Sequence, residues 1–340
     1  MSLRVAVVGA TGAVGTVMLE KLRERNFPAR EIVPFASERS AGRVLDGGLV
    51  VQALSEETIQ GFDIAIFSAG ATTSREWAPR FAAAGCVVVD NSSAFRRDPE
   101  IPLVVSEVNP EALDAHKGII ANPNCSTMQL MVALKPIYDA AGIERLIVST
   151  YQSVSGTGVK AVEELESQTH AVLHGMEVPP AEIYREPIAF NVHGGAGNFL
   201  DGDDHTDEER KMMFETRKIL GDESMAISVT CARVPVISSH SESVNVQTRE
   251  PLEVEEARAL LEAMPGITMV DPYPTASGAA GHDDVFVGRL RRDPSHERGL
   301  QMWVVSDNLR KGAATNAVQL AEQLYARGLV GAARTATAAG

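Results

Sequence analysis

The sequence is poor in the features of secreted and membrane proteins. Its 340 residues include only three cysteines, an odd and small number that favours a reducing compartment without a disulfide framework. No apolar run approaches the roughly 20 residues of a membrane span. The apolar stretch at the N-terminus is too short for a signal peptide and runs directly into glycines. We therefore expect a cytoplasmic protein that does not contact membranes.

An excess of basic residues is also absent. The chain has 31 Lys and Arg against 45 Asp and Glu, a net charge of −14, which disfavours nucleic acid as the main partner. An anionic substrate would need local clusters of Arg or Lys. Hydrophobic residues make up 44% and charged residues 22%, which is typical of a globular protein long enough for two domains.

The N-terminal third has the pattern of a dinucleotide-binding fold. The apolar run "LRVAVV" (3–8) is followed by the glycine-rich turn "GATGAVG" (9–15) and then by a helical pattern. The apolar runs 62–69 and 85–90 alternate with helix-like segments such as 73–84. This rhythm predicts an α/β, Rossmann-like, doubly wound N-terminal domain.

Beyond residue 124 the pattern changes to strands with fewer helices. A helix is expected at 158–173, and strands are expected at 145–154, 225–238, 243–248, 284–292 and 300–307. They predict a mixed α+β second domain, and its role in catalysis and dimerisation depends on a family resemblance rather than on this pattern. The helical pattern at 309–329 is expected to pack back on the first domain, while the tail 334–340 frays. The resulting boundaries are 1–124 with 313–340 for the NADP-binding domain and 125–312 for the second.

The glycine turn predicts the cofactor. Its spacing is G-x-x-G-x-x-G rather than the usual G-x-G-x-x-G, so the flanking strand and helix carry the argument, and a tight turn without a ligand is the alternative. The turn would place backbone amides against a pyrophosphate, and its candidate residues are Gly9, Thr11, Gly12, Ala13 and Val14.

The end of the second strand, "EIVPFAS" (31–37), bears on the choice between NAD and NADP. Ser37, Arg39 and Ser40 are donors suited to a 2′-phosphate. Glu38 is the competing signal, because a carboxylate suits the ribose of NAD, and Arg39 could equally be a solvated loop charge. We favour NADP.

The stretch "NPNCST" (122–127) places a cysteine where a short apolar strand gives way to a helical pattern at 128–138. Pro123 disfavours helix for Asn122, so Cys125 is expected at a strand-to-helix turn. The helix dipole there favours a thiolate. Cys86 and Cys231 lie in apolar strands and are interpreted as core.

Together these stretches identify a family. "GATGAVG", "ASERSAG", "VVVDNSSAFR", "NPNCST", "STYQSVSGTG", "ETRKI", "TCARVPV", "SHSESV", "DVFVGRLRRD" and "MWVVSDNLRKGAA" follow one another along nearly the whole chain. The set resembles the bacterial type of aspartate-β-semialdehyde dehydrogenase. The sequence departs from that pattern at 193–205, a Gly/Asp-rich segment to which we assign no role.

The resemblance implies an activity. It is the NADP-dependent, phosphate-requiring interconversion of L-aspartate-4-semialdehyde and L-4-aspartyl phosphate, in the synthesis of lysine, threonine and methionine. It also implies a homodimer or a dimer of dimers. Cys125 would be the nucleophile that forms a thioester, and His240 the acid/base group. Outside the motif, a lone loop histidine such as His240 would be interpreted as a solvated surface residue.

The resemblance assigns further residues. Gln152 would orient the carbonyl group of the substrate or thioester, and Asn124 would position the thioester oxygen. Arg96 and Lys218 would hold phosphate, Glu215 the substrate ammonium, and Arg233 the α-carboxylate. Ser155, Gly156 and Asn316 would lie near the cofactor.

Each assignment has a structural alternative. Arg97 could replace Arg96, Glu215 and Lys218 could form a surface ion pair, and Arg233 could form an internal salt bridge. His170 and His174 are spaced i, i+4, but without further ligands we predict no metal site.

Three other functions compete. N-acetyl-γ-glutamyl-phosphate reductase runs the same thioester chemistry, but its acylated substrate offers no ammonium for Glu215. A glyceraldehyde-phosphate dehydrogenase-like enzyme fits the motifs less well. A non-catalytic NADP-binding regulator would not need Cys125, His240 and Arg233 together.

Overall fold

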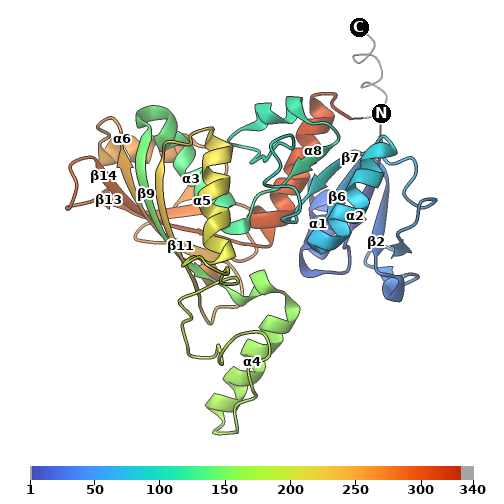
Figure 1. Ribbon diagram of the computed structural model, residues 1–340, viewed down its shortest axis with the longest axis horizontal. Helices are drawn as coiled ribbons and strands as arrows, with labels where there is room; N and C mark the ends of the chain where they lie inside the picture. The colour runs from blue at the N-terminus through green and yellow to red at the C-terminus, as the bar shows by residue number, and fades with distance from the viewer. Residues whose placement is uncertain (1, 331–340) are drawn as a thin grey trace. The chain divides into compact units, whose positions relative to one another are not determined.

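The computed structural model describes residues 2–330 of the chain; the predicted fraying at 334–340 lies outside these residues. Internal contacts divide the chain into two units (Figure 1). Unit 1 comprises the chain up to Asn124 and from Ala313 onward, and unit 2 comprises Cys125–Gly312.

Unit 1 contains a six-stranded, all-parallel sheet in the order β5-β2-β1-β6-β7-β8. Its strands are β1 (Leu3–Val8), β2 (Ala29–Ala36), β5 (Gln52–Ala53), β6 (Ile64–Phe67), β7 (Val87–Asp90) and β8 (Ile119–Ala121). The order reverses at β1, which has β2 on one side and β6 on the other. Because ligands of such sheets bind outside the carboxyl ends of the strands at this switch point, the fold positions a cofactor site beside the β1 turn.

Helices cover both faces of this sheet, because alternate residues of the strands are apolar on each side. Val5 and Val7 join a buried cluster with α1 (Ala13–Glu24) and α8 (Asn316–Ala326). Ala6 and Val8 belong to the opposite cluster, which includes side chains of α2 (Gly70–Ala83). The Rossmann-like prediction for this unit is confirmed.

Unit 2 contains a mixed six-stranded sheet in the order β10-β9-β11-β14-β13-β12. Its strands are β9 (Ile143–Gln152), β10 (Ala226–Arg233), β11 (His240–Thr248), β12 (Ile267–Met269), β13 (Val285–Arg292) and β14 (Gly299–Ser306). The helices α3 (Cys125–Ala141), α5 (Asp207–Leu220) and α6 (Val254–Ala263) pack together on it. The predicted mixed α+β domain is confirmed.

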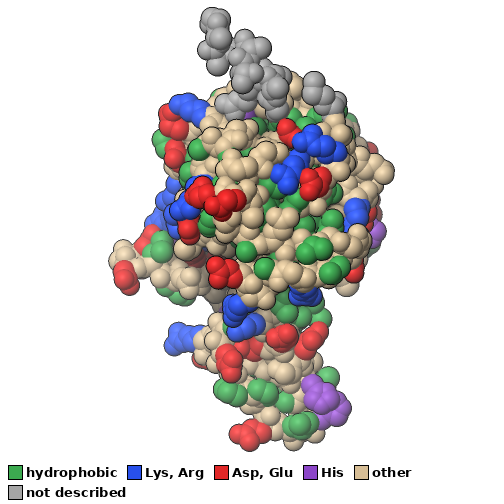
Figure 2. Space-filling model, turned by 90° about the vertical axis from the view of Figure 1, so that its right-hand side faces the viewer, with side chains coloured by type: hydrophobic (Ala, Val, Ile, Leu, Met, Phe, Trp, Pro, Cys, Tyr) green, Lys and Arg blue, Asp and Glu red, His purple; other side chains and the backbone are tan. Residues whose placement is uncertain are grey.

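Helix α4 (Val159–Leu173) projects away from this sheet in Figure 1. Figure 2 shows hydrophobic side chains exposed among acidic ones on this projecting part, with histidines gathered on it. The remaining short elements are η1 (Glu38–Ser40), β3 (Val44–Leu45), β4 (Leu49–Val50), η2 (Pro110–Ala115), η3 (Val154–Thr157), α7 (Ala276–Ala279) and the π-helical η4 (Arg310–Thr315). Within residues 2–330, no helix combines the length and apolar character that crossing a membrane requires.

Two predicted segments need correction. The strand expected at 225–238 ends at Arg233: Val234 N still donates to Gln152 O of β9, but Pro235 has no N–H to donate and Val236 N donates to Val234 O. The helix expected at 309–329 begins with η4, and its α-helical part is only α8. The Gly/Asp-rich segment 193–205 is followed directly by Thr206, which forms a capping box with Glu209 and so begins α5.

Candidate functional site

Steric constraints explain two glycines of the turn after β1. Gly9 has φ of +87°, and a Cβ atom there would lie 2.3 Å from the carbonyl oxygen of Ser68. A Cβ at Gly15 would lie 2.1 Å from the carbonyl oxygen of Gly9. These glycines let the turn pass β6 closely and let α1 pack against it. Gly12 is different, since its Cβ would meet only Gly9 oxygen at 3.4 Å.

A cavity of about 550 Å³ opens at this turn, within unit 1. Its lining includes Gly9, Thr11 and Gly12 from the turn and Ser37 and Glu38 from the end of β2. Gly12 is the N-cap of α1 and no side chain caps that helix, so its first-turn N–H groups suit a pyrophosphate. The residues present therefore fit a dinucleotide.

The lining of this cavity also bears on the choice between NAD and NADP at the end of the second strand. All three residues of η1 lie next to one another, but only Glu38 is part of the lining, and Arg39 and Ser40 are not. The competing carboxylate is thus at least as close to the cavity as the donors expected for a 2′-phosphate.

Asn316, which is expected near the cofactor, has all its hydrogen-bonding groups engaged by neighbouring residues. Its side chain is completely buried at the start of α8. Its Oδ1 accepts from Ser106 N at 2.9 Å, and its Nδ2 donates to Val104 O at 3.0 Å and to Asn122 Oδ1 at 2.6 Å. Every polar atom of the side chain is therefore used inside unit 1, and sequence alone could not distinguish this scaffold role from cofactor binding.

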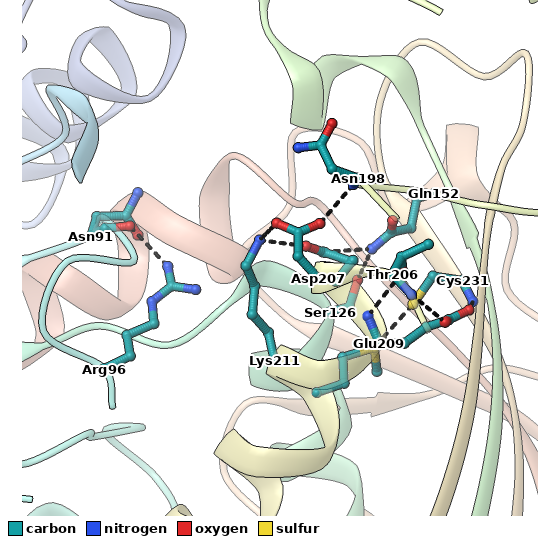
Figure 3. Close-up of polar contacts among 12 residues, drawn as sticks. Asn91, Arg96, Ser126, Gln152, Asn198, Thr206, Asp207, Glu209, Lys211 and Cys231 are labelled. Atoms are coloured by element: carbon teal, nitrogen blue, oxygen red, sulfur yellow. Dashed lines mark hydrogen bonds and ion pairs between the residues drawn. The ribbon is translucent and has the colours of Figure 1, made fainter. Parts of the chain in front are cut away.

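Arg96 is held by the same network. Its Nη2 donates to Asn91 O at 3.0 Å (Figure 3). Asn91 Oδ1 accepts from Asn122 Nδ2 at 2.7 Å. Arg96 is 8% exposed whereas Arg97 is exposed, so Arg96 is the arginine with the environment of a binding residue. Asn124, which is 7% exposed, ends this unit.

Cys125 is the first residue of α3, directly after β8 and the Asn-Pro-Asn turn, as the sequence predicts. It is partly exposed, whereas Cys86 and Cys231 are buried. A Cβ at Gly312 would lie 2.9 Å from the Cβ of Cys125, so only glycine allows the chain to pass this close to the thiol-bearing residue.

The strand register of unit 2 aligns polar side chains in one row across the sheet. Arg233 pairs with Gln152, and His240 pairs with Ser306. Ser241 pairs with Tyr151, which places His240 beside Gln152 on the next strand. Because side chains alternate between faces, the row points to the face covered by α3. The residues of the row, from β10 to β14, are Arg233, Gln152, His240 and Ser306.

Gln152 connects this row to α3. Its Nε2 donates to Ser126 Oγ at 2.5 Å and to Glu208 Oε1 at 3.1 Å (Figure 3). Ser126 follows Cys125, so the start of α3 lies against the row. Gln152 is 1% exposed, yet its Oε1 has no hydrogen-bond partner among the described residues. A buried carbonyl oxygen without a partner is a place for a ligand to donate.

Arg233 also has unused hydrogen-bonding capacity. It is 8% exposed, its Nη1 donates to Ser153 O at 2.6 Å, and its Nε has no partner among the described residues. The alternative of an internal salt bridge finds no support within residues 2–330, where the guanidinium group makes its one hydrogen bond to a backbone carbonyl. A buried, uncompensated guanidinium suits a bidentate carboxylate ligand.

His240 is the first residue of β11 and is 1% exposed, so the interpretation as a solvated loop histidine is excluded. Burial, followed by the charge of Arg233, lowers the pKa of His240 from 6.5 to about 3, and the ring is therefore neutral at pH 7. Its Nδ1 lies 3.1 Å from both the N and the Oγ of Ser153. Its Nε2 has no hydrogen-bond partner among the described residues.

Ser155 and Gly156 lie beside this histidine on η3. A Cβ at Gly156 would lie 3.2 Å from His240 Nε2 and 3.5 Å from Arg233 Nη1. The absence of a side chain at Gly156 therefore leaves the space in front of both groups open.

Helix α5 contributes carboxylates to the covered face. Glu215 is 1% exposed and Lys218 is half-buried one turn later, so the alternative of a solvent-exposed surface pair does not apply. Glu208, which sequence reasoning missed, contacts Gln152. Its spacing of seven residues from Glu215 was the available signal, since that spacing puts both on one helical face.

The segment 193–205 has a structural role at the edge of the sheet. His193 and Arg233 exchange two backbone hydrogen bonds of 2.9 Å, and Ala196 N donates to Cys231 O at 2.8 Å. The segment thus pairs with the otherwise open edge of β10 and fixes the backbone of Arg233.

The structure offers no metal centre in the described part of the chain. The rings of His170 and His174 stack with centroids 4.2 Å apart on α4. No group of three or more His, Cys, Asp or Glu side chains in residues 2–330 is arranged to hold an ion.

Comparisons with known proteins agree with this arrangement. Residues 4–116 match the family described as semialdehyde dehydrogenase, NAD binding domain, and residues 134–311 match semialdehyde dehydrogenase, dimerisation domain. The chain is 54% identical to aspartate-semialdehyde dehydrogenase of Aquifex aeolicus, over 97% of this chain and 100% of the relative.

Solved structures give the same result. Aspartate semialdehyde dehydrogenase II of Vibrio cholerae is 50% identical and superposes with a TM-score of 0.93, covering 96% of this chain and 99% of that one. The same enzyme complexed with ASA gives a TM-score of 0.92 at 49% identity, over 96% and 98% of the chains. A more distant relative from Candida albicans, solved with NADP, gives a TM-score of 0.74 at 26% identity, over 96% and 99%.

The fold and these matches define an oxidoreductase with an NAD-binding domain and a dimerisation domain, which supports a homodimer. The chain belongs to the aspartate-semialdehyde dehydrogenase family, whose members are enzymes of amino-acid biosynthesis.

Proposed function

We propose that the chain interconverts L-aspartate-4-semialdehyde and L-4-aspartyl phosphate with NADP and inorganic phosphate, through a thioester on Cys125, in the pathway to lysine, threonine and methionine. The observation that carries this proposal is the buried row of Arg233, Gln152 and His240 against the start of α3. A row with a neutral imidazole and unused polar atoms is suited to a small polar substrate.

The residues of unit 2 account for the steps. The Cys125 thiolate adds to the aldehyde carbon and forms a thiohemiacetal. His240 Nε2, which has a free face toward Gly156, accepts the hydroxyl proton as the carbonyl reforms. NADP, when bound, supplies the acceptor for the hydride that leaves the same carbon. Phosphate oxygen then attacks the resulting thioester, and the Cys125 thiolate leaves.

Substrate recognition follows from charge. Arg233 suits the α-carboxylate and Glu215 the ammonium group, while Arg96 and Lys218 are each suited to phosphate. Asn124 and Gln152 would hold the thioester oxygen. The Vibrio cholerae relative solved with ASA supports this substrate.

For the cofactor we favour NADP on the donors Ser37, Arg39 and Ser40, with Glu38 as the argument for NAD. The Candida albicans relative solved with NADP supports that choice. The assembly that we propose is a homodimer or a dimer of two such homodimers.

The test is the formation of NADPH from L-aspartate-4-semialdehyde, with and without phosphate, and with NAD in place of NADP. We expect phosphate-dependent turnover with NADP, and loss of turnover with retained NADP binding in Cys125→Ala. Turnover only with the N-acetylglutamyl semialdehyde would indicate the reductase. NADP binding without turnover of either substrate would indicate a regulator.

A further inference from the structure

A fully buried carboxyl group in unit 2 takes no part in the proposed chemistry. Glu242 follows His240 by two residues on β11 and therefore points to the same face of the sheet, which α3 covers. Its exposed fraction is 0%, and neither of its carboxyl oxygens has a hydrogen-bond partner of ordinary geometry within residues 2–330. Because a buried polar group is costly unless it is paired, a second group has to compensate for Glu242.

Helix α3 brings such a group to the same place. Gln129 has an exposed fraction of 0% and is the only polar residue in the stretch 128–134 of this helix. Burial raises the pKa of the Glu242 carboxyl group well above its usual range, and the amide of Gln129 is close enough to oppose that shift. The Nε2 and Oε1 atoms of Gln129 also have no hydrogen-bond partner of ordinary geometry within residues 2–330. The two side chains therefore meet with all their terminal atoms available to each other.

The chemistry of the two groups is complementary. Thr150 on β9 and Val304 on β14, the residues opposite Glu242 in the sheet, are uncharged. A fully buried carboxyl group without a cation beside it keeps its proton, because the charged form loses its hydration. A protonated carboxyl group offers a donor and an acceptor, and the amide of Gln129 offers the same. The two groups can therefore form a pair of hydrogen bonds, whichever carboxyl oxygen carries the proton.

The place of this contact relates it to the candidate site. Cys125 and Gln129 are four residues apart on α3, so they lie on one face of the helix, one turn apart. His240 and Glu242 are likewise one side-chain repeat apart on one face of β11. A contact between Gln129 and Glu242 therefore sets the helix face that bears Cys125 against the strand face that bears His240.

The start of α3 is attached to the sheet at a second point. Gln152 Nε2 donates to Ser126 Oγ at 2.5 Å, and Gln152 lies in the same row across the sheet as His240. The contact between Gln129 and Glu242 lies one side-chain repeat further along the strands. One attachment alone would let the helix pivot on the sheet, whereas two attachments fix its direction.

We propose that Glu242 is a positioning residue, whose carboxyl group pairs with the Gln129 amide and holds α3 in register with β11. The pair thereby keeps the spacing of Cys125 and His240 on which the reaction depends, so this inference rests on the proposed function. The motif "SHSESV" contains Glu242 but assigns it no role. Glu242 acts only through the helix, and it contacts neither substrate nor cofactor.

The first test needs no turnover. A protonated carboxyl group has a C=O stretching band above the amide I band in the infrared spectrum, and a carboxylate has none there. The difference spectrum between the parent protein and Glu242→Gln at pH 7 should contain this band. In Gln129→Met the band should move to higher frequency, because the carboxyl group loses its hydrogen bonds. A parent protein without the band, or a band that Gln129→Met leaves in place, would overturn the pairing.

Kinetics test the positioning. Glu242→Met keeps the approximate volume but not the hydrogen bonds, and it should lower kcat roughly 10- to 100-fold with little change in KM, since small displacements of reacting groups have effects of this size. Glu242→Gln is neutral and can still pair with an amide, so it should retain most of kcat. Gln129→Met should resemble Glu242→Met, and the double variant should be no slower than either single one. Gln247→Met, on the opposite face of β11, is the control.

The outcomes separate the two proposals. A parent protein without dehydrogenase activity but with the expected infrared bands would contradict only the proposed function. Unchanged kcat in Glu242→Met, a loss in Glu242→Gln as large as in Glu242→Met, or losses that multiply in the double variant would contradict the role of Glu242. If the two methionine variants do not fold, Gln129→Asn decides, because it keeps a polar amide but shortens its reach. Unchanged kcat in Gln129→Asn would then overturn the proposal.

Discussion

The buried imidazole of His240 couples the candidate site to the stability of the protein. Its pKa is 6.5 in a solvated chain and about 3 in the folded protein. Below pH 6.5 the unfolded chain therefore takes up a proton that the folded protein does not. The free energy of unfolding must fall as the pH is lowered from 6.5 toward 3, and above pH 6.5 this residue has no effect on it.

We expect His240→Gln to remove this dependence. Relative to the variant, the parent protein should lose about 2 kcal/mol of unfolding free energy between pH 7 and pH 5. Urea unfolding at both pH values measures it. His174→Gln, at the exposed C-cap position after α4, is the control and should keep the pH dependence of the parent protein. An equal change for the parent protein and His240→Gln would mean that His240 titrates normally in the folded state.

For single residues, the sequence predicts which residues belong to the candidate site better than it predicts how buried they are. Cys125 was placed from Pro123 and the helical pattern alone, and the structure confirms its place at the start of α3. His240 and Arg233 were assigned through resemblance, and their burial depends on strand pairing with residues about 80 positions away. Ser153 lies inside the quoted stretch "STYQSVSGTG", yet its contact with His240 could not be predicted, because hydrogen bonds between separate turns leave no local pattern.

The glycine turn and α1 illustrate how an element constrains its residues. Gly15→Ala would bring a Cβ to 2.1 Å from a backbone oxygen that cannot move aside. Gly12→Ala meets only an ordinary contact, at φ of −82°, but adds a methyl group to the lining of the cofactor cavity. The two substitutions should therefore separate stability from binding.

We expect Gly15→Ala to lower the free energy of unfolding by about 1–3 kcal/mol through overpacking. Gly12→Ala should keep its stability but bind NADP roughly tenfold more weakly, a change of about 1.4 kcal/mol. Thermal unfolding without cofactor and titration calorimetry with NADP measure the two effects. Gly194→Ala, which has nothing within 4 Å of the added atom, is the control. Equal stability of Gly15→Ala and this control would refute the steric argument.

Among the elements, the strands of unit 1 were the easiest to predict, since parallel strands covered on both faces read as continuous apolar runs. Boundaries were harder where long-range contacts decide them. The run 225–238 looks uniform in sequence, but β10 ends at Arg233 where the segment around His193 pairs with it. The capping box that begins α5 at Thr206 was present in the sequence and could have been recognised.

The two faces of the sheet in unit 2 differ, because α3, α5 and α6 cover only the face that bears the polar row. The other face bears a cavity of about 510 Å³ lined by Ser241, Ser243, Tyr273, Pro274, Thr275, Ala276, Arg289, Arg291, Met302 and Trp303. The rings of Tyr151 and Trp303 are 5.3 Å apart there, and Tyr151 is 39% exposed. A face that combines exposed aromatic groups with arginines fits the interface of a homodimer.

Ser243 is exposed on β11 and pairs with Trp303, so it marks the middle of this face. In a twofold-symmetric dimer each copy would present the same residue, and Ser243→Glu would place two desolvated carboxylates in one interface. We expect the dimer to weaken at least roughly 100-fold, about 2.7 kcal/mol. Light scattering with size-exclusion chromatography over a dilution series measures this. Thr72→Glu, exposed on α2 in unit 1, adds the same charge as a control. If the Ser243→Glu protein stays dimeric at every concentration, the interface lies on another surface. The exposed apolar residues at the end of α4, Val172, Leu173 and Met176, would then be tested next.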